Sequence, residues 1–359
     1  PEGRLFGINE MLYPWKEGHF PIETPFFNQQ SLAFPGGGGS NTVHKADIGN
    51  QASLSFGADG TISNEPSFSI SAWVYMTDVE NFSIFSKGSG ASMQYVLGTF
   101  GSGIMSFTLS DNNDSHFIGR TTSGIAASET VVQGFLNKWV HIVATYDGSR
   151  VPGGIKLYVN GSELATAATS GGGYSAMENL NVPAQIGRTN DQDGMSTSGF
   201  IDELAVMSVG LTATQVSELY NGGVTFNLEK FSVFNTFVSW WRLGDSKTGT
   251  SPNFTIPDLV GNNDVTMSNF TGNSTSGIVS FHAPSEYDQE IIQENNCLWA
   301  KERAERTLIT GRNTEVDSDR QEILDVINNL NDATPPNFKG PNGTYQGSTY
   351  ALRRFARPY

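Results

Sequence analysis

The chain has 359 residues, of which 37% are hydrophobic and 16% are charged, and it contains 40 glycines. This composition excludes a disordered chain and a bundle of long helices, and it is typical of strands joined by turns. The formal net charge of −15 argues against nucleic acid as the main partner, because binding to phosphates needs clustered Lys and Arg side chains.

The first strong pattern along the chain is a strand. Residues 1–29 are rich in Pro, Phe and Gly without a period, which predicts an irregular N-terminal arm. At residues 68–76 one parity is apolar, and because successive side chains of a strand point to opposite faces, this strand has one strongly apolar side. The apolar parity holds Phe68, Ile70, Ala72, Val74 and Met76, and the other holds Ser69, Ser71, Trp73 and Tyr75.

Further runs of the same kind predict a succession of strands. They lie at residues 83–87, 94–98, 104–109, 116–120, 138–146 and 155–159. Asn160 and Gly161 then supply the two positive-φ residues that a tight hairpin turn needs, so the next strand begins at Ser162. Short strands at this spacing, with turns rich in Gly and Asn, predict a mainly β sandwich or barrel.

One short helix interrupts the strands. Thr212 can cap its N-terminus, Gln215 completes a capping box, and Gly222 ends it. The face expected to pack down consists of Val216, Leu219 and Tyr220.

The chain after residue 226 changes character twice. Residues 227–284 return to strands, one of them at residues 237–243, and helical spacing at 287–306 and 318–330 predicts a helical segment over 285–332. Residues 333–359 hold four Pro, three Gly and no acidic residue, which predicts an extended basic arm. Its positive side chains are Lys339, Arg353, Arg354 and Arg357.

Five motifs occur in an order that resembles the laminin-G-like jelly-roll family. They are FSISAWV at 68–74, KWVHIVATYD at 138–147, IKLYVNG at 155–161, QIG at 185–187 and GFIDE at 199–203, followed by the helix at 211–220. The resemblance covers residues 30–225. It implies a laminin-G-like (concanavalin A-like) jelly-roll β-sandwich.

One part of the pattern is displaced. Such domains usually open with a Trp-x-Leu-Asp strand and an Asp-x-x-Gly-Asn segment, but here WWRLGD at 240–245 and DLVGN at 258–262 follow the helix. Either a second domain begins here, or residues 226–284 fold back to complete or extend the same sandwich. We favour the latter, because two strands cannot bury a core by themselves.

The C-terminal part resembles segments of large virion proteins of tailed bacteriophages. The similar stretches run from AKERAER at 300–306 to QGSTYALRR at 346–354. This resemblance implies that the terminal segments attach the sandwich to other copies of itself or to neighbouring virion proteins. The expected assembly contacts are Arg353, Arg354, Phe355, Arg357 and Tyr359.

Asp202 and Glu203 form the nearest match to the acidic pair with which glycosidases of similar fold flank a sugar bond. Because adjacent strand residues face opposite sides, these two are not expected to act on one substrate, and we predict that the protein is not an enzyme. Asp202 shares its parity with Phe200, Leu204 and Val206, so we expect it to point toward the apolar side. A carboxylate there must be paired, hydrogen-bonded or bound to a metal.

The resemblance to the wider superfamily implies a structural Ca²⁺ at Asp202, held together with groups near the opening strand. Asp245 is the expected second ligand, since Ca²⁺ takes several oxygen donors. The alternative is that Asp202 only accepts hydrogen bonds from backbone N–H groups.

Two kinds of ligand site are also candidates. Trp73 and Tyr75 can form an aromatic platform for a sugar ring, and the polar loops at 111–114 and 190–193, the second with Asp191 and Asp193, can bind a cation or a sugar. The alternatives are aromatic side chains covered by a neighbouring segment and ordinary solvated turns.

The leading hypothesis is a non-enzymatic structural virion protein, a phage capsid-surface or tail component. The alternative is a carbohydrate-binding adhesin or lectin module that binds surface glycans, and the third is a glycan-cleaving enzyme. Each places the chain on a virion or at an extracellular surface. No apolar run is long enough to span a membrane, and the single cysteine, Cys297, permits no intrachain disulfide. Because the chain opens with Pro1, we expect a missing preceding segment and draw nothing from the lack of a visible secretory signal.

Overall fold

The computed structural model divides the chain into two compact units, one spanning Phe26–Glu286 and the other combining Pro1–Pro25 with Tyr287–Tyr359. It describes residues 28, 30–36, 44–57, 65–88, 92–101, 103–111, 115–123, 134–188, 197–223, 225, 227–250, 252–270, 277–280, 284, 337–340 and 343–346. The predicted helical segment 285–332 and all but residue 28 of the predicted N-terminal arm lie outside these residues. Within the predicted basic arm, β19 (Asn337–Gly340) and β20 (Gly343–Gln346) form an antiparallel hairpin.

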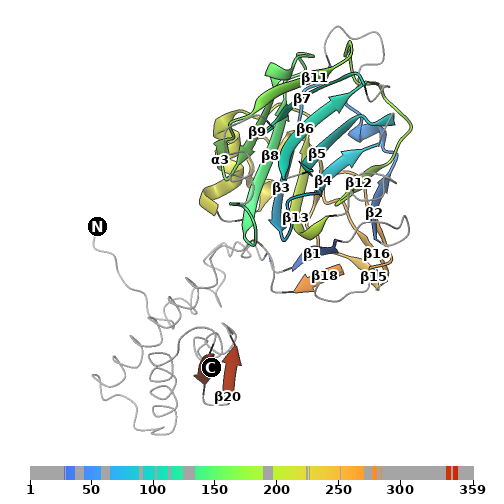
Figure 1. The fold of residues 1–359 in the computed structure, drawn as a ribbon. Helices are drawn as coiled ribbons and strands as arrows, with labels where there is room; N and C mark the ends of the chain where they lie inside the picture. Colours follow the sequence, from blue (N-terminus) through green and yellow to red (C-terminus); the bar gives the residue numbers. More distant parts are fainter. Residues whose placement is uncertain are drawn as a thin grey trace, which may run out of the picture. The chain divides into compact units, whose positions relative to one another are not determined.

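The unit Phe26–Glu286 is a sandwich of two antiparallel sheets (Figure 1). Sheet A has the strand order β10 (Ser162–Glu163), β9 (Ile155–Val159), β8 (Trp139–Tyr146), β3 (Phe68–Met76), β13 (Ser198–Met207), β1 (Gln30–Pro35) and β18 (Gly277–Ser280), with β14 (Phe237–Trp241) also paired to β13. Sheet B has the order β11 (Ala167–Gly171), β7 (Phe117–Thr121), β6 (Ile104–Ser110), β5 (Tyr95–Phe100), β4 (Phe82–Lys87), β12 (Ala184–Ile186), β2 (Lys45–Gly49), β17 (Val265–Ser268), β16 (Asn253–Ile256) and β15 (Thr248–Thr250). The predicted fold class, a mainly β sandwich with one short helix, is confirmed.

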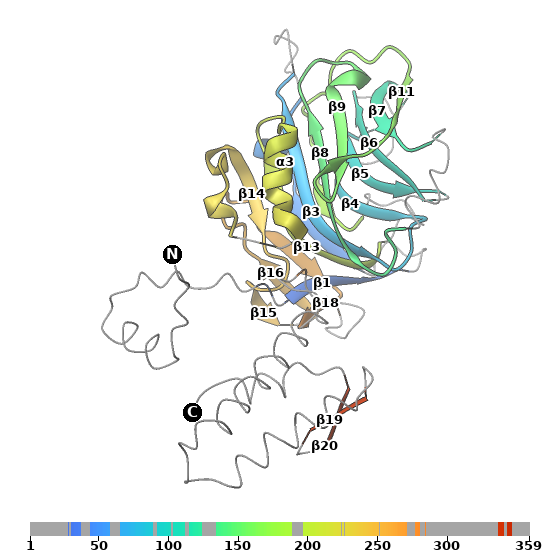
Figure 2. The same ribbon diagram turned by 90° about the vertical axis from the view of Figure 1, so that its left-hand side faces the viewer.

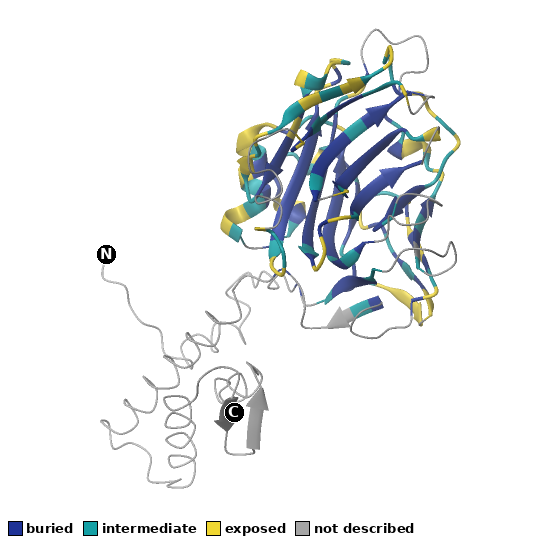
Figure 3. Cartoon of the chain, viewed as in Figure 1, coloured by how far each residue is buried: buried dark blue, intermediate teal, exposed yellow. Residues whose placement is uncertain are grey.

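The core lies between the two sheets. The apolar parity of β3 faces it, as the alternation predicts, and the ring of Phe68 stacks on Phe56 with centroids 4.3 Å apart. Burying a large apolar side chain of this kind contributes about 1.5–3 kcal/mol, so the inner faces of the strands hold the sandwich together. Figure 3 shows the strands mostly buried, with exposed residues gathered at turns and on the helix.

The helix α3 (Ala213–Tyr220) covers the outer face of sheet A (Figure 2). The predicted capping box is present, since Thr212 accepts from the backbone of Gln215 and the Gln215 side chain accepts from the backbone of Thr212. Asn221 ends the helix in the left-handed conformation at φ 48°. Val216 and Leu219 are buried in a second cluster, so the outer face of sheet A also carries an apolar layer. Among the described residues no helix is long and apolar enough to cross a membrane.

The hairpin turn between β9 and β10 also forms as predicted. Asn160 and Gly161 have φ values of 49° and 77°, and the flanking strands pair antiparallel. A side chain in place of Gly161 would bring its Cβ to 3.0 Å from the ring of Tyr220 in α3. The turn therefore needs glycine both for its backbone and for the helix above it.

Residues 237–241, the displaced opening strand, lie within sheet A. β14 pairs with the second half of β13 while β1 pairs with its first half, so the two share one side of the same strand. The junction is tight, because a Cβ at Gly244 would stand 2.7 Å from the Cβ of Gln30. β16 and β17 in turn extend sheet B through β2.

Candidate functional site

A β-bulge in β13 shapes the outer face of sheet A. The register with β3 shifts between Asp202 and Ala205, and Glu203 adopts a left-handed φ of 46°. This conformation costs a residue with a Cβ about 1–2 kcal/mol, so other contacts must hold it. The bulge inserts one extra residue into β13. Residues beyond it therefore alternate between the two faces of the sheet in the opposite order.

This reversal corrects the predicted direction of Asp202. Asp202 lies opposite Trp73 on the outer face, whereas Leu204 and Val206 lie in the core between the sheets. The expectation that Asp202 points to the core was wrong, because it assumed an unbroken alternation through the bulge. The argument that Asp202 and Glu203 lie on opposite faces fails for the same reason.

Glu203 links β13 to β14. It accepts hydrogen bonds from Trp240 Nε1 at 2.7 Å and from Arg242 Nε at 3.0 Å, and Arg242 Nη2 also donates to Asp245 at 2.9 Å. Burial raises the pKa of Glu203 to about 7, against the lowering effect of Arg242. These bonds supply the contacts that hold Glu203 in its left-handed conformation.

Asp202 is fully buried and has neutral hydrogen-bond partners. Its Oδ2 accepts from Asn28 Nδ2 at 2.9 Å, and its Oδ1 accepts from the backbone N–H of Glu203 at 2.8 Å. Burial, and then the charge of Glu203, raise the pKa of this carboxyl well above its ordinary value. Asn28 Nδ2 also donates to the carbonyl oxygen of Pro284 at 2.9 Å, while Asn28 Oδ1 is buried with no partner among the described residues.

The groups near Asp202 that could ligate a calcium ion are an amide and a backbone carbonyl rather than acidic side chains. Within the described part of the chain, no group of three or more His, Cys, Asp or Glu residues could hold a metal, and Asp245, the expected second ligand, is bonded to Arg242. Ca²⁺ also accepts amide and backbone carbonyl oxygens. Asn28 contacts Asp202 through Nδ2 and has an unpartnered Oδ1, and the carbonyl of Pro284 accepts from the same Nδ2, so these two residues could contribute such oxygens next to Asp202.

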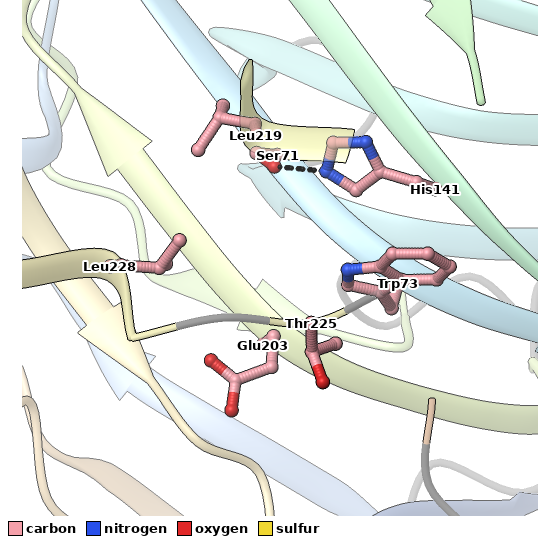
Figure 4. A pocket seen from close by; sticks show the side chains of 7 residues that line it. All are labelled: Ser71, Trp73, His141, Glu203, Leu219, Thr225 and Leu228. Atoms are coloured by element: carbon pink, nitrogen blue, oxygen red, sulfur yellow. Dashed lines mark hydrogen bonds between the residues drawn. The ribbon is translucent and has the colours of Figure 1, made fainter. Parts of the chain in front are cut away.

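A small pocket lies under α3, between the helix and the outer face of sheet A (Figure 4). Its volume of about 10 Å³ has room for a single water molecule. It is lined by Ser71, Trp73, His141, Glu203, Leu219, Thr225 and Leu228.

Ser71 and His141 make a hydrogen bond in this pocket that invites comparison with a nucleophile and its base. Ser71 Oγ lies 2.8 Å from His141 Nε2, but the other ring nitrogen, Nδ1, has no partner among the described residues. Burial lowers the pKa of His141 to about 3, so the ring is neutral and a weak base at neutral pH. Because Ser71 is only 3% exposed, this pair serves packing rather than attack on a substrate.

The predicted aromatic platform is split by α3. Trp73 is 5% exposed, and Tyr220 of the helix covers it with ring centroids 6.0 Å apart. Tyr75 instead belongs to a row of three half-buried aromatic side chains on neighbouring strands, which we call the aromatic row: Trp139, Tyr75 and Phe200. Tyr75 lies 5.8 Å from Trp139 and 5.6 Å from Phe200, between ring centroids.

The predicted ligand residues Asp191 and Asp193 lie outside the described residues, as do residues 112–114 of the first polar loop. The same holds for the predicted assembly contacts Arg353, Arg354, Phe355, Arg357 and Tyr359. Asp111, at the start of that loop, pairs with His116 at 3.2 Å. Sequence reasoning missed Asn28, Pro284, Trp139 and Phe200. Only the two aromatic residues carried a signal, since each stands at the start of a predicted strand or motif.

Comparison with known proteins identifies the fold family. Residues 48–217 match the family model Laminin_G_3, the concanavalin A-like lectin/glucanases superfamily. No curated protein is significantly similar to the sequence.

Three solved structures illustrate the likeness. A Bacteroides ovatus protein described as a proposed carbohydrate binder shares 18% identity over 73% of this chain and 62% of its own, with a TM-score of 0.41. The heptameric pentraxin of Limulus polyphemus shares 20% identity over 54% of this chain and 82% of its own, with a TM-score of 0.35. Domains LG4-5 of the mouse laminin α1 chain share 16% identity over 50% of this chain and 41% of their own, with a TM-score of 0.32.

The chain thus spans less than two thirds of the first of these proteins, and likeness at such identities concerns the fold alone. None of the three structures is described as a virion protein. On the family match and the two-sheet architecture together, this chain contains a laminin-G-like jelly-roll domain of the concanavalin A-like lectin/glucanases superfamily.

Proposed function

We propose that this protein is a non-catalytic carbohydrate-binding module acting at a virion or extracellular surface, and that a sugar ring stacks on the aromatic row. The observation that carries the proposal is the register of Trp139, Tyr75 and Phe200 on three adjacent strands. Aromatic faces pack against the C–H groups of a pyranose ring, and binding sites combine such surfaces with a few polar groups. The hydroxyls of Thr77 and Ser198, paired at 2.8 Å on the neighbouring register positions, can supply those polar groups.

Two further points support a binding role. The family model that matches residues 48–217 is one of lectins and glucanases, so a sugar is the ligand class that it suggests. The acidic pair is withdrawn from solvent, with Asp202 0% and Glu203 4% exposed, and both carboxylates are engaged in hydrogen bonds within the fold. A glycosidase needs its two carboxyl groups on either side of a bound sugar.

The test is a glycan array followed by calorimetric titration of the best ligand. Tyr75→Ala and Trp139→Ala should each weaken binding roughly 2- to 10-fold, since an aromatic contact contributes about 0.5–1.5 kcal/mol. Phe100→Ala is the matched control, because Phe100 is a half-buried aromatic at the end of β5 in sheet B and should leave affinity unchanged. A wild-type protein that binds no glycan, or row variants that bind like the control, would contradict the proposal.

A structural calcium ion belongs to the same proposal. We place it at Asp202, where it would offset the charge of a buried carboxylate whose hydrogen-bond partners are neutral. Chelation should then lower the melting temperature, because an ion that binds only the folded state stabilises it by mass action. Equal melting curves with chelator and with excess calcium would remove the ion from the proposal.

A structural role in a virion is the second candidate. It rests on the charge of residues 333–359, which hold four positive side chains and no acid on a chain of net charge −15. Aromatic residues and Arg dominate the energetics of interfaces, so this segment suits contact with another copy or a neighbouring protein. A chain truncated after residue 332 should assemble less than the full chain in light scattering, and the difference should narrow in high salt, which screens the charge of the segment. Equal assembly of the two chains would count against this role.

A further inference from the structure

The three rings of the aromatic row form a compact cluster. Strands β8 and β13 lie on either side of β3, so two strand spacings, about 10 Å, separate the backbones of Trp139 and Phe200. The centroids of their rings are only 6.4 Å apart, so the two outer side chains lean toward each other. With distances of 5.8 and 5.6 Å to the ring of Tyr75, the three centroids form a nearly equilateral triangle.

The cluster is bounded on two sides. Further along β3, Tyr220 of α3 covers Trp73 and lies 6.2 Å from the ring of His141 on the neighbouring strand. On the other flank, β1 places Ala33 opposite Phe200, and Ala33 is fully buried. The helix therefore closes the outer face of the sheet along the strands, and Ala33 offers no open surface across them.

The two remaining sides lie at a rim of the sheet. β9 pairs with β8 only from Ile142 onward, so Trp139 has no strand on its outer side within the described part of the chain. β3 ends at Met76, and β13 begins at Ser198. The hydroxyls of Thr77 and Ser198, 2.8 Å apart, stand at this rim beside the rings. A ligand can reach the row from here and meet both kinds of group.

These dimensions suit one sugar ring rather than a stretch of polysaccharide. A linear glycan that lies flat on a sheet contacts aromatic faces spread along its length, and each further contact adds to its affinity. In the aromatic row the three rings lie within 6.4 Å of one another at interplanar angles of 52° to 83°, so they offer no extended flat surface. The rest of a bound chain would project past the rim.

We infer that the aromatic row binds a single sugar at the non-reducing end of a glycan, and that α3 sets this limit by covering Trp73. The inference rests on the proposed function and adds which part of a glycan the row binds. Surface glycans are attached through their reducing ends, so their non-reducing ends project outward and can enter a site at a rim.

The experiment measures affinity by calorimetry on the full chain. The probes are the methyl glycoside of the sugar that binds best on the glycan array, linear oligomers of that sugar of increasing length, and the same oligomers extended at the non-reducing end by a different sugar. Affinity should change by less than about twofold with length, because no further aromatic contact is made. The extended oligomers should bind at least tenfold more weakly.

A variant of the helix tests what sets the limit. Tyr220→Ala uncovers Trp73, which lies two residues from Tyr75 on the same face of β3. Its affinity should therefore rise with oligomer length, by roughly 2- to 10-fold for the added aromatic contact. Thr214→Ala, on the exposed side of α3, is the matched control and should keep the wild-type profile.

The outcomes separate this inference from the proposed function. If wild-type affinity grows with oligomer length, or if the extended oligomers bind as tightly as the others, the row binds the interior of glycans and the inference is wrong while the proposed function stands. A Tyr220→Ala profile as flat as that of the wild type would overturn the limit set by α3. If the wild type binds no glycan, both fall. Should Tyr220→Ala fail to fold, the wild-type profile decides.

Discussion

Replacing Glu203 by glycine has two opposing effects on the stability of the fold: it relieves backbone strain at the bulge, and it removes the hydrogen bonds of the carboxylate. Glycine removes the strain of the left-handed conformation, a gain of about 1 kcal/mol. It also removes the acceptor of Trp240 Nε1, which stays buried, and one partner of Arg242. An orphaned buried donor costs about 1–3 kcal/mol, and breaking a buried ion pair costs about 3–5 kcal/mol.

The lower end of the ion-pair range applies, because Arg242 is 18% exposed and keeps its bond to Asp245. We therefore expect Glu203→Gly to lower the free energy of unfolding by about 3 kcal/mol, measured by urea denaturation. Glu203→Gln keeps the shape and one acceptor and should lose less. Asn137→Gly is the control, since Asn137 has a similar φ of 56° but is exposed, and its change should be within about 0.5 kcal/mol. A Glu203→Gly protein as stable as the wild type would refute the reasoning, because strain relief would then outweigh the bonds.

Three more perturbations test other parts of the fold. Burial lowers the pKa of His141 from 6.5 to about 3. The stability that the neutral imidazole contributes is therefore present above pH 6.5 and is lost as the pH falls toward 3. In urea titrations, His141→Gln should show a smaller loss of unfolding free energy between these two pH values than the wild type. Burial lowers the pKa of Lys87 from 10.5 to about 8, so the wild type should gain stability as the pH rises from 8 to 10.5, and Lys87→Met should lack that gain when the two are compared at each pH. Thr212→Ala removes the capping box of α3 and should cost about 1 kcal/mol by thermal or urea unfolding, whereas Thr214→Ala, on the exposed side of the same helix, should cost little.

The secondary structure followed from local rules that the sequence displays. The apolar parity of residues 68–76 placed Phe68 and its partners in the core, and the capping box located the helix from Thr212 onward. Asn160 and Gly161 defined their turn because few other residues adopt two positive φ values in succession. Each of these features is decided within a few residues, so the chain shows it before it folds.

The candidate site depended on contacts between distant segments. Tyr75 was visible as a candidate, but its neighbours Trp139 and Phe200 come from strands 64 and 125 positions further along the chain, and only the sheet order sets them beside it. Trp73 has the same parity as Tyr75 and was indistinguishable from it in sequence. Because α3 covers Trp73 and not Tyr75, Trp73 is buried whereas Tyr75 stays partly accessible.

The sequence by itself determined the sandwich, its helix and its turns, because strand period, caps and positive-φ residues act locally. The tertiary structure decided the direction of Asp202, since a regular pleat is the only guide that the sequence offers and the bulge at Glu203 breaks it. That bulge is held by Trp240 of β14 and by Arg242 just after it, more than 30 residues later in the chain, and Asn28 reaches Asp202 across 174 residues. A left-handed glutamate costs free energy locally and is stable only where such remote bonds offset the cost, so no window of neighbouring residues could have revealed it.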